Sequence, residues 1–340
     1  ERAIEARAAA DNRTFFLVEA FNRADGKRLW EHRVEATGTL PGVHDKHNLA
    51  SPSPVTDGQM VYAWFGTGQI VALDMSGKLI WQRHLGKEYA PVSITWGPGS
   101  SPVVYKDALI LLNYHGKSSY LLSLDAKTGK QRWKTDHQSG VTSYSTPVVV
   151  PGPNGPELVV NASDGVAGFN PDTGARIWYY NEANSFPVPA AVHENGVIYL
   201  NRGYRSSPYM AIKPGGKGDI SSTHVLWRQA TSGPYVPSII QYQGLVYMAT
   251  DQGIVSAVDA ATGQRVWQER IPGVYMASPV AGDGKIYLVG ETGETLVLEA
   301  GRQLKILARN KLEGRFSASP AIAGGHIFLR SDDRIVAIGK

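Results

Sequence analysis

Cysteine is absent from this 340-residue chain, and its absence excludes several kinds of chemistry. Without a thiol there is no disulfide framework, no thiolate nucleophile and no thiolate metal site. No apolar run approaches the roughly 18 residues that a membrane-spanning helix needs. The net charge is only +4 and is spread without basic blocks, which does not suit a nucleic-acid-binding protein. We therefore expect no nucleic-acid partner and no transmembrane segment.

A helical period of 3.6 residues is also missing from residue 14 onward. Residues 1–10, rich in alanine, glutamate and arginine, are the one candidate for a short helix. The remaining chain shows short apolar runs separated by turn residues, which indicates strands. We accordingly divide the sequence into an N-terminal extension, residues 1–13, and a single domain, residues 14–340.

What the chain does contain is a repeated phrase that ends in tryptophan. Clear copies occupy residues 124–133, 169–178 and 258–267, and a weaker copy at residues 298–306 places Ile306 in the tryptophan position. Asp or Asn at a strand end can bond the turn amides, and Gly supplies the positive φ of a tight hairpin. Burying an indole contributes roughly 4–6 kcal/mol before opposing terms. We therefore expect the repeated tryptophans to pack between neighbouring sheets. They are Trp30, Trp81, Trp133, Trp178, Trp227 and Trp267.

A second landmark precedes each phrase, namely a small residue beside a proline that opens an apolar strand. The clear copies begin at Ser53, Ser101, Thr146, Ser278 and Ser319. Looser copies occur at Val188-Pro189 and Val236-Pro237. Proline is tolerated at the first residue of a strand. One unit is thus four short strands with local pairing, which predicts the blades of an all-β propeller.

The repeat is consistent with either seven or eight blades. Six complete units begin near residues 53, 101, 146, 188, 236 and 278, and a seventh begins at Ser319 and has three strands. With seven blades, residues 28–34 would complete the last one. With eight, residues 14–34 would be the outer half of a blade whose inner strands precede Glu1. Since residues 21–30 contain the full repeat phrase, we favour eight blades, the first incomplete.

The phrase Asp-x-x-Thr-Gly-x-x-x-Trp and the Ser-Pro openers resemble the repeat of PQQ-like (pyrroloquinoline-quinone-type) β-propeller proteins over residues 14–340. Residues 50–58, 203–205 and 215–219 are also similar to an uncharacterised bacterial subfamily with this repeat. The resemblance implies a propeller of four-stranded antiparallel blades. The same architecture serves BamB, a non-enzymatic scaffold of the outer membrane, and the quinoprotein dehydrogenases, which bind PQQ and calcium.

The resemblance does not extend to a cofactor site. The PQQ alcohol dehydrogenases carry an adjacent-cysteine disulfide and a Glu/Asn/Asp calcium set. This chain has no cysteine, and no position matches that calcium set. We therefore expect no cofactor and no catalytic residue, and keep a site for PQQ with calcium as the alternative.

Three features are candidates for binding a ligand. The loop around His44 and His47 combines two histidines with Asp45, but its spacing matches no metal-ligand pattern. Arg202 and Arg205 could pair with a carboxylate-bearing ligand. The glycine-rich residues 213–219 lack a phosphate-loop context and are expected to form a flexible turn. A set of aromatic residues precedes the strand openers and could gather at one end of the blades, either as packing or as a binding face. They are Tyr144, Phe186, Tyr235, Tyr275 and Phe316.

These observations together predict a non-enzymatic protein located outside the cytoplasm, in the periplasm or secreted. We expect it to act as a protein-interaction scaffold or ligand-binding protein, with a protein partner or small ligand on its loop faces and an association with the cell envelope. Two alternatives stay open, a PQQ- and calcium-dependent oxidoreductase and a carbohydrate-binding module.

Overall fold

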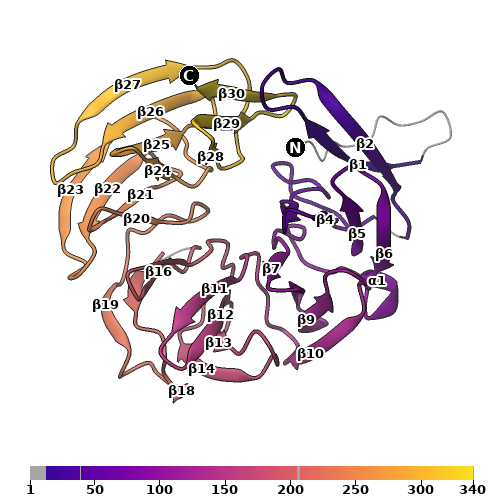
Figure 1. The fold of residues 1–340 in the computed structure, drawn as a ribbon. Coiled ribbons are helices and arrows are strands. Elements are labelled where there is room, and N and C mark those ends of the chain that lie inside the picture. The colour runs from indigo at the N-terminus through magenta and orange to yellow at the C-terminus, as the bar shows by residue number, and fades with distance from the viewer. Residues whose placement is uncertain (1–12, 39, 205–206, 340) are drawn as a thin grey trace. The chain divides into compact units, whose positions relative to one another are not determined.

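The computed structural model describes residues 13–38, 40–204 and 207–339 (Figure 1). The residues expected to form a helical extension lie almost entirely outside this part of the chain. Contacts divide the described residues into two compact units. Unit 1 contains the residues up to Val149 together with Ala162–Asp164 and Phe169–Arg176. Unit 2 contains Val150–Asn161, Gly165–Gly168 and the residues from Ile177 onward.

Strands account for nearly all of the regular structure. The first two, β1 (Phe15–Phe21) and β2 (Arg28–Glu35), form a hairpin. Two four-stranded sheets follow. The first contains β3 (Val55–Thr56), β4 (Met60–Trp64), β5 (Gln69–Asp74) and β6 (Leu79–His84). The second contains β7 (Val103–Tyr105), β8 (Ala108–Tyr114), β9 (Ser119–Asp125) and β10 (Gln131–His137).

A five-stranded sheet contains β11 (Val148–Gly152), β12 (Gly155–Ala162), β13 (Gly165–Phe169), β14 (Arg176–Asn181) and β18 (Gly218–Asp219). The following sheet contains β15 (Val192–Glu194), β16 (Val197–Asn201), β17 (Tyr209–Ile212) and β19 (Val225–Gln229). The next contains β20 (Ile240–Tyr242), β21 (Leu245–Ala249), β22 (Ile254–Asp259) and β23 (Arg265–Arg270). The last two contain β24 (Val280–Gly282), β25 (Lys285–Val289), β26 (Glu294–Glu299) and β27 (Ile306–Lys311), and then β28 (Ala321–Ala323), β29 (His326–Arg330) and β30 (Ile335–Gly339).

The fold is an all-β propeller, but the expectation of eight blades is wrong. Within the described residues, seven sheets have three strands or more, and each of these is a blade. The strands β1 and β2 pair only with each other, in register from Phe15 opposite Glu35, so they form a ribbon and no eighth blade. The repeat phrase misled the count because it specifies a hairpin, and a hairpin can exist without the two further strands of a blade.

The single helix of the described residues is α1 (Leu85–Glu88), one turn that sequence periodicity did not predict. Four residues are too few to show a period of 3.6. The turn is tied back to β6 because the Glu88 carboxylate accepts hydrogen bonds from Arg83 and from the backbone N–H of His84. No helix of the described chain is long and apolar enough to cross a membrane.

The core lies between the faces of neighbouring blades. In unit 1, Tyr62 and Ile70 of one sheet pack with Leu109 and Leu122 of the next. In unit 2, a second cluster joins residues of β21 and β22 to residues of β25 and β26. In Figure 1 the corresponding sheets of unit 2 follow one another, and the first strands β20 and β24 contact each other. Alternating side chains of each strand thus enter the two interfaces of its blade.

The repeated tryptophans act as the spacers that the sequence predicts. Five of the six indole N–H groups donate to a backbone carbonyl of a following turn, at 2.8–3.2 Å. Four of these rings lie against the glycine of the repeat phrase in that turn. A Cβ on that glycine would lie 2.5–2.8 Å from the ring, so glycine is required for close packing as well as for its positive φ. These glycines are Gly77, Gly129, Gly174 and Gly263.

The sixth tryptophan, Trp178, has a different partner because the insertion after β17 replaces the usual turn. Its indole donates to the Glu157 carboxylate at 2.7 Å, and its ring packs on Gly168. The insertion adds β18 to the edge of β14 as a parallel strand, with Gly218 opposite Trp178. The glycine-rich segment therefore contains a short paired strand, and the prediction of a flexible turn is wrong at that point.

The placement of Ile306 in a tryptophan position is also wrong. Trp267 lies opposite Ala257, beyond a bulge. The corresponding residue in the next blade is Ala308, which lies opposite Val297, whereas Ile306 lies before the bulge and opposite Leu298. Both blades have this bulge, but the turn before β27 is one residue longer. The backbone N–H of Glu299 donates to the Lys305 carbonyl, six residues on, whereas that of Asp259 donates to Gln264, five residues on, so simple spacing misses the shift.

The small residues of the strand openers form a hydrogen-bonded series. The backbone N–H of Ser53 donates to the Ser101 hydroxyl, and that of Ser101 donates to Thr146, at 2.9 and 3.0 Å. In unit 2 the hydroxyls of Ser238, Ser278 and Ser319 accept in the same way from Ala190, Ser238 and Ser278, each at 2.9 Å. The hydroxyl thus joins successive blades at their first strands.

Candidate functional site

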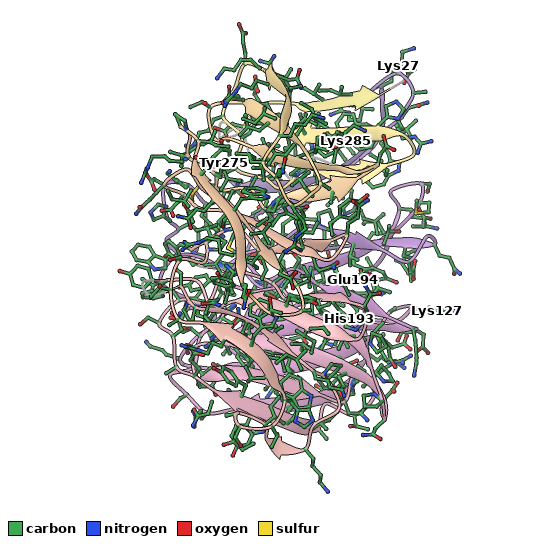
Figure 2. All side chains as sticks on the ribbon, turned by 90° about the vertical axis from the view of Figure 1, so that its left-hand side faces the viewer. Lys27, Lys127, His193, Glu194, Tyr275 and Lys285 are labelled. Carbon is green, nitrogen blue, oxygen red and sulfur yellow. The ribbon has the colours of Figure 1, made fainter. Side chains whose placement is uncertain are left out.

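The antiparallel strands give each blade of unit 2 two distinct faces. The turns between first and second strands and between third and fourth strands lie on one face, which we call the turn face. The turns between second and third strands and the connections to the next blade lie on the other, which we call the loop face. Figure 2 shows Tyr275, in a connection between blades, on the opposite side of the sheets from Glu194 and Lys285, which border first turns.

Three aromatic side chains meet on the loop face of unit 2. Tyr204 lies between Phe186 and Tyr235, with ring centroids 5.2 and 5.1 Å apart, respectively. All three side chains are half-buried. Burial and the neighbouring Tyr204 raise the pKa of Tyr235, so its phenol is neutral near pH 7. We call Phe186, Tyr204 and Tyr235 the aromatic cluster.

The backbone at Gly203 brings these residues together. Gly203 has φ +81°, and a Cβ there would lie 3.1 Å from the carbonyl oxygen of Tyr235 and 3.2 Å from that of Phe186. The loop after β16 therefore lies directly on the two connections that carry the outer aromatic residues. Only glycine permits both the conformation and the close approach.

Two buried asparagines fix the same connections. The Asn161 amide donates to the carbonyl oxygens of Pro189 and Asn201, at 2.9 and 3.1 Å. The Asn201 amide donates to those of Pro234 and Pro237, at 2.8 and 3.0 Å. Both asparagines come at the end of the second strand of a blade. The aromatic cluster is thus held on hydrogen-bonded backbone, and its rings are rigidly placed.

Arg202 is completely buried beneath the loop. Its guanidinium donates to the Asn161 side-chain oxygen, to the Gly165 carbonyl at 3.1 Å and to the Glu182 carbonyl at 2.6 Å. Each of these acceptors belongs to the protein, so the structure gives Arg202 a positioning role and no open path to a ligand. Arg205, the other predicted cation, lies outside the described residues.

The remaining predicted aromatic residues are buried in separate places. Tyr275 and Phe316 are each 1% exposed and belong to different core clusters. Tyr144 lies in unit 1 and is 8% exposed. The structure therefore brings together two of the five, Phe186 and Tyr235. Tyr204 was not among the predicted site residues, although the phrase Gly203-Tyr204-Arg205 was the signal that could have identified it.

His44 and His47 diverge toward different partners. The His47 ring is bonded to the Pro98 carbonyl at 3.0 Å, and burial lowers the pKa of His47. His44 lies 2.6 Å from Asp45 and packs edge-on against Trp96. In the described part of the chain, no three His, Cys, Asp or Glu side chains are grouped as a metal ion needs.

A buried histidine in unit 1 should make stability depend on pH. His115 follows β8 and is 3% exposed, and its Nδ1 finds no hydrogen-bond partner among the described residues. Burial lowers the pKa of His115 from 6.5 to about 4. Because the folded state binds fewer protons than the unfolded chain in this range, stability should fall as the pH drops through it. The loss should reach roughly 3 kcal/mol.

Urea unfolding between about pH 7 and about pH 4 measures this loss. The carboxylates also contribute in acid, so the contribution of His115 is the difference between the wild type and His115→Asn. The variant should lose much less stability over the same range. Parallel curves for the two proteins would contradict the assignment.

Comparison with known proteins places the chain among propellers of varied function. A family model described as outer membrane protein assembly factor BamB matches residues 14–207, 217–276 and 251–339. The crystal structure of BamB from Moraxella catarrhalis superposes with a TM-score of 0.68 and 16% identity, covering 97% of this chain and 93% of that one. A europium-containing methanol dehydrogenase gives a TM-score of 0.71 and 13% identity, covering 96% and 80%. These two likenesses show the fold alone.

A curated relative is the tetrathionate hydrolase of Acidithiobacillus ferrooxidans, which is 26% identical over 285 residues. The match covers 76% of this chain, and the chain spans about half the length of that relative. The family model, in contrast, matches nearly every described residue. This protein therefore belongs to the PQQ-like β-propeller family whose model is described as outer membrane protein assembly factor BamB.

Proposed function

We propose that this chain is a non-catalytic binding propeller that holds a protein partner on the loop face of unit 2. The observation that carries the proposal is the aromatic cluster, three half-buried rings in which Tyr204 contacts both of the others. Tyrosine is enriched at interface hot spots because it supplies a large contact area at a low cost in conformational entropy. The cluster thus has the composition of an interface centre.

The rigidity of the cluster supports the same function. Gly203, Asn161 and Asn201 fix the backbone beneath the rings, and Arg202 holds the side chain of Asn161 in turn. A surface that is ordered before binding loses little entropy when a partner arrives. The half-exposed phenol of Tyr235 is neutral near pH 7 and can donate a hydrogen bond to a partner carbonyl.

Location outside the cytoplasm is part of this proposal. It is supported by membership of a family described by an outer membrane assembly factor. The partner we propose is accordingly a protein of the cell envelope. Fractionation of the native host with an antibody to this chain tests the location, and recovery in the cytoplasmic fraction would contradict it.

Removing the outer rings of the cluster should abolish partner capture while the fold remains. In the double variant Phe186→Ala, Tyr235→Ala, recovery of the partner from a native envelope extract should fall at least tenfold, because truncating hot-spot residues costs about 2 kcal/mol or more each. Quantitative mass spectrometry of immobilised protein measures recovery, and melting temperature reports on folding.

The matched control is Tyr287→Ala, which removes a half-buried tyrosine from the middle of β25. This variant should retain full capture. Equal recovery by wild type and the double variant, with both proteins folded, would overturn the proposal. Tyr275→Ala is unsuitable as a binding variant, since Tyr275 is 1% exposed and its loss should destabilise the core.

The similarity to tetrathionate hydrolase gives a second candidate function, hydrolysis. Unit 1 contains a histidine beside a carboxylate, an arrangement that can support hydrolysis. The His137 Nε2 atom lies 2.8 Å from the Asp164 carboxylate, and the His137 ring stacks on Tyr114 with centroids 4.9 Å apart. A carboxylate that orients an imidazole is one element of a general base. Consumption of tetrathionate above a blank without protein would favour this function over the binding proposal.

A further inference from the structure

A groove of about 620 Å³ opens on the turn face of unit 2, on the opposite side of the sheets from the aromatic cluster. It lies between the turn that contains Asn195, the turn at Gln243 and Gly244, and two turns after third strands at Ala260 and Gly301. Three successive blades therefore contribute to it. The volume is in the range of about 300–1,000 Å³ found for small-molecule sites.

The walls of the groove are held by the repeated tryptophans. The Trp227 indole donates to the carbonyl of Ala260 at 2.8 Å, and the Trp267 indole donates to that of Gly301 at 3.1 Å. The backbone N–H of Gly301 donates to the Tyr247 hydroxyl at 2.8 Å. The two turns that line the groove are thus fixed from behind, as a preformed binding site requires.

Three amide side chains line the groove without a partner. Asn195, Gln241 and Gln243 make no side-chain hydrogen bond to any residue that the structure describes, and all three border the groove. Each amide offers donors and an acceptor. Their convergence on one concave surface provides complementary hydrogen-bonding groups for a ligand that both donates and accepts.

The charge at the groove is balanced. Arg302 donates to the Asp259 carboxylate at 2.9 Å, and this hydrogen bond lowers the pKa of Asp259. The other carboxylate oxygen of Asp259 is bonded to the backbone of the turn and to Thr262. The pair brings no net charge, so the groove does not select for an anion or a cation. The guanidinium of Arg302 retains donors for a neutral oxygen.

Apolar side chains also line the groove. Among them are Val197, Leu226 and Leu245, of which Leu226 is 51% exposed. An exposed leucine can contact the C–H surface of a ligand, and the unpartnered amides can bond to hydroxyl groups along its edge. A neutral sugar ring has both.

We propose that this groove binds a neutral oligosaccharide. Side-chain amides and Arg302 would bond its hydroxyl groups, and Leu226 with the other apolar lining residues would contact the C–H face of a ring. The site is separate from the aromatic cluster in position and in chemistry, so the proposal stands or falls independently of the protein-binding function. A neutral peptide is the competing occupant, because its main chain also donates and accepts.

The test is a binding screen of the intact chain against arrayed neutral oligosaccharides of glucose, galactose, mannose and N-acetylglucosamine, with a library of neutral peptides in parallel. The best glycan is then titrated calorimetrically against wild type, Gln241→Met and Arg302→Met. Each variant removes hydrogen-bonding groups and keeps a side chain of similar length. We expect each to weaken glycan binding at least tenfold. The double variant Phe186→Ala, Tyr235→Ala should bind the glycan as wild type does.

The matched control is Gln59→Met, the same change at an exposed position of unit 1, which should leave glycan affinity unchanged. Melting temperatures show whether each variant is folded. The proposal is overturned if no neutral glycan binds, or if a glycan binds wild type, Gln241→Met and Arg302→Met equally. Binding of a peptide that is lost in Gln241→Met, without glycan binding, would also overturn it and assign the groove to peptides.

Discussion

Replacing Trp178 with alanine should lower the free energy of unfolding by about 3–5 kcal/mol, the usual cost of truncating a fully buried large aromatic side chain. Trp178 has no exposed surface, and Glu157, which is 2% exposed, accepts its indole N–H at 2.7 Å. The variant therefore creates a cavity and also leaves a buried carboxylate without this donor. The second effect places the cost at the upper end of the range.

Chemical unfolding of matched variants measures this loss and separates the cost of the cavity from the cost of the lost hydrogen bond. Trp178→Phe retains most of the ring and removes the donor, so it should lie between wild type and Trp178→Ala. Trp30→Ala is the comparison for a spacer that is only half-buried and donates to the Met75 carbonyl, and its loss should be smaller. Equal losses for Trp30→Ala and Trp178→Ala would show that the Glu157 contact contributes little.

Replacing Arg202 with methionine should cost about 3–5 kcal/mol, in line with removing one partner from a buried charged network. The side chain is completely buried and donates to Asn161, Gly165 and Glu182. Methionine fills a similar volume, so lost hydrogen bonding and not a cavity should dominate. Partner capture should also fall, because Asn161 and Asn201 position the connections that carry Phe186 and Tyr235.

The control for Arg202 is Arg309→Met in the same unit. Arg309 forms an ion pair with Glu294 at 3.3 Å, and the two side chains are 45% and 34% exposed. Exposed ion pairs contribute about 0–1 kcal/mol, so this variant should be nearly as stable as wild type. If Arg202→Met were also nearly neutral in urea unfolding, the network would not be the support of the loop face.

The sequence was sufficient to predict an all-β propeller, though not its number of blades, because the repeat phrase specifies a hairpin turn and a buried tryptophan. Glycine predicted a tight turn and tryptophan predicted packing between neighbouring sheets. The contact of the Trp227 ring with Gly263 of the next blade was found only in the structure. The blade count failed because β1 and β2 carry the phrase of a hairpin but pair only with each other. The placement of Ile306 in the tryptophan position failed because the turn before β27 is one residue longer than in the preceding blade, and the degenerate phrase gave no sign of that extra residue.

The candidate sites were less predictable, because they depend on which loops meet in space. Equivalent positions in the repeat suggested five aromatic residues, yet burial separates Tyr275 and Phe316 from Phe186 and Tyr235. The contact between Phe186 and Tyr235 runs through Tyr204, in a loop with no repeat equivalent. The amide side chains of the groove could not be predicted as a site, because in the sequence Asn195 and Gln243 look like ordinary turn residues.

Site-specific photo-crosslinking in the native host tests most directly whether the loop face of unit 2 is the binding surface. Benzoylphenylalanine is introduced in place of Tyr204 in one strain and in place of Lys285 in a second strain. Lys285 begins β25 on the turn face, and Figure 2 shows it on the opposite side of the sheets from Tyr275. We expect one predominant envelope protein to crosslink from position 204 and not from position 285. Crosslinks of equal yield and identity from both positions, or none from position 204, would contradict the account.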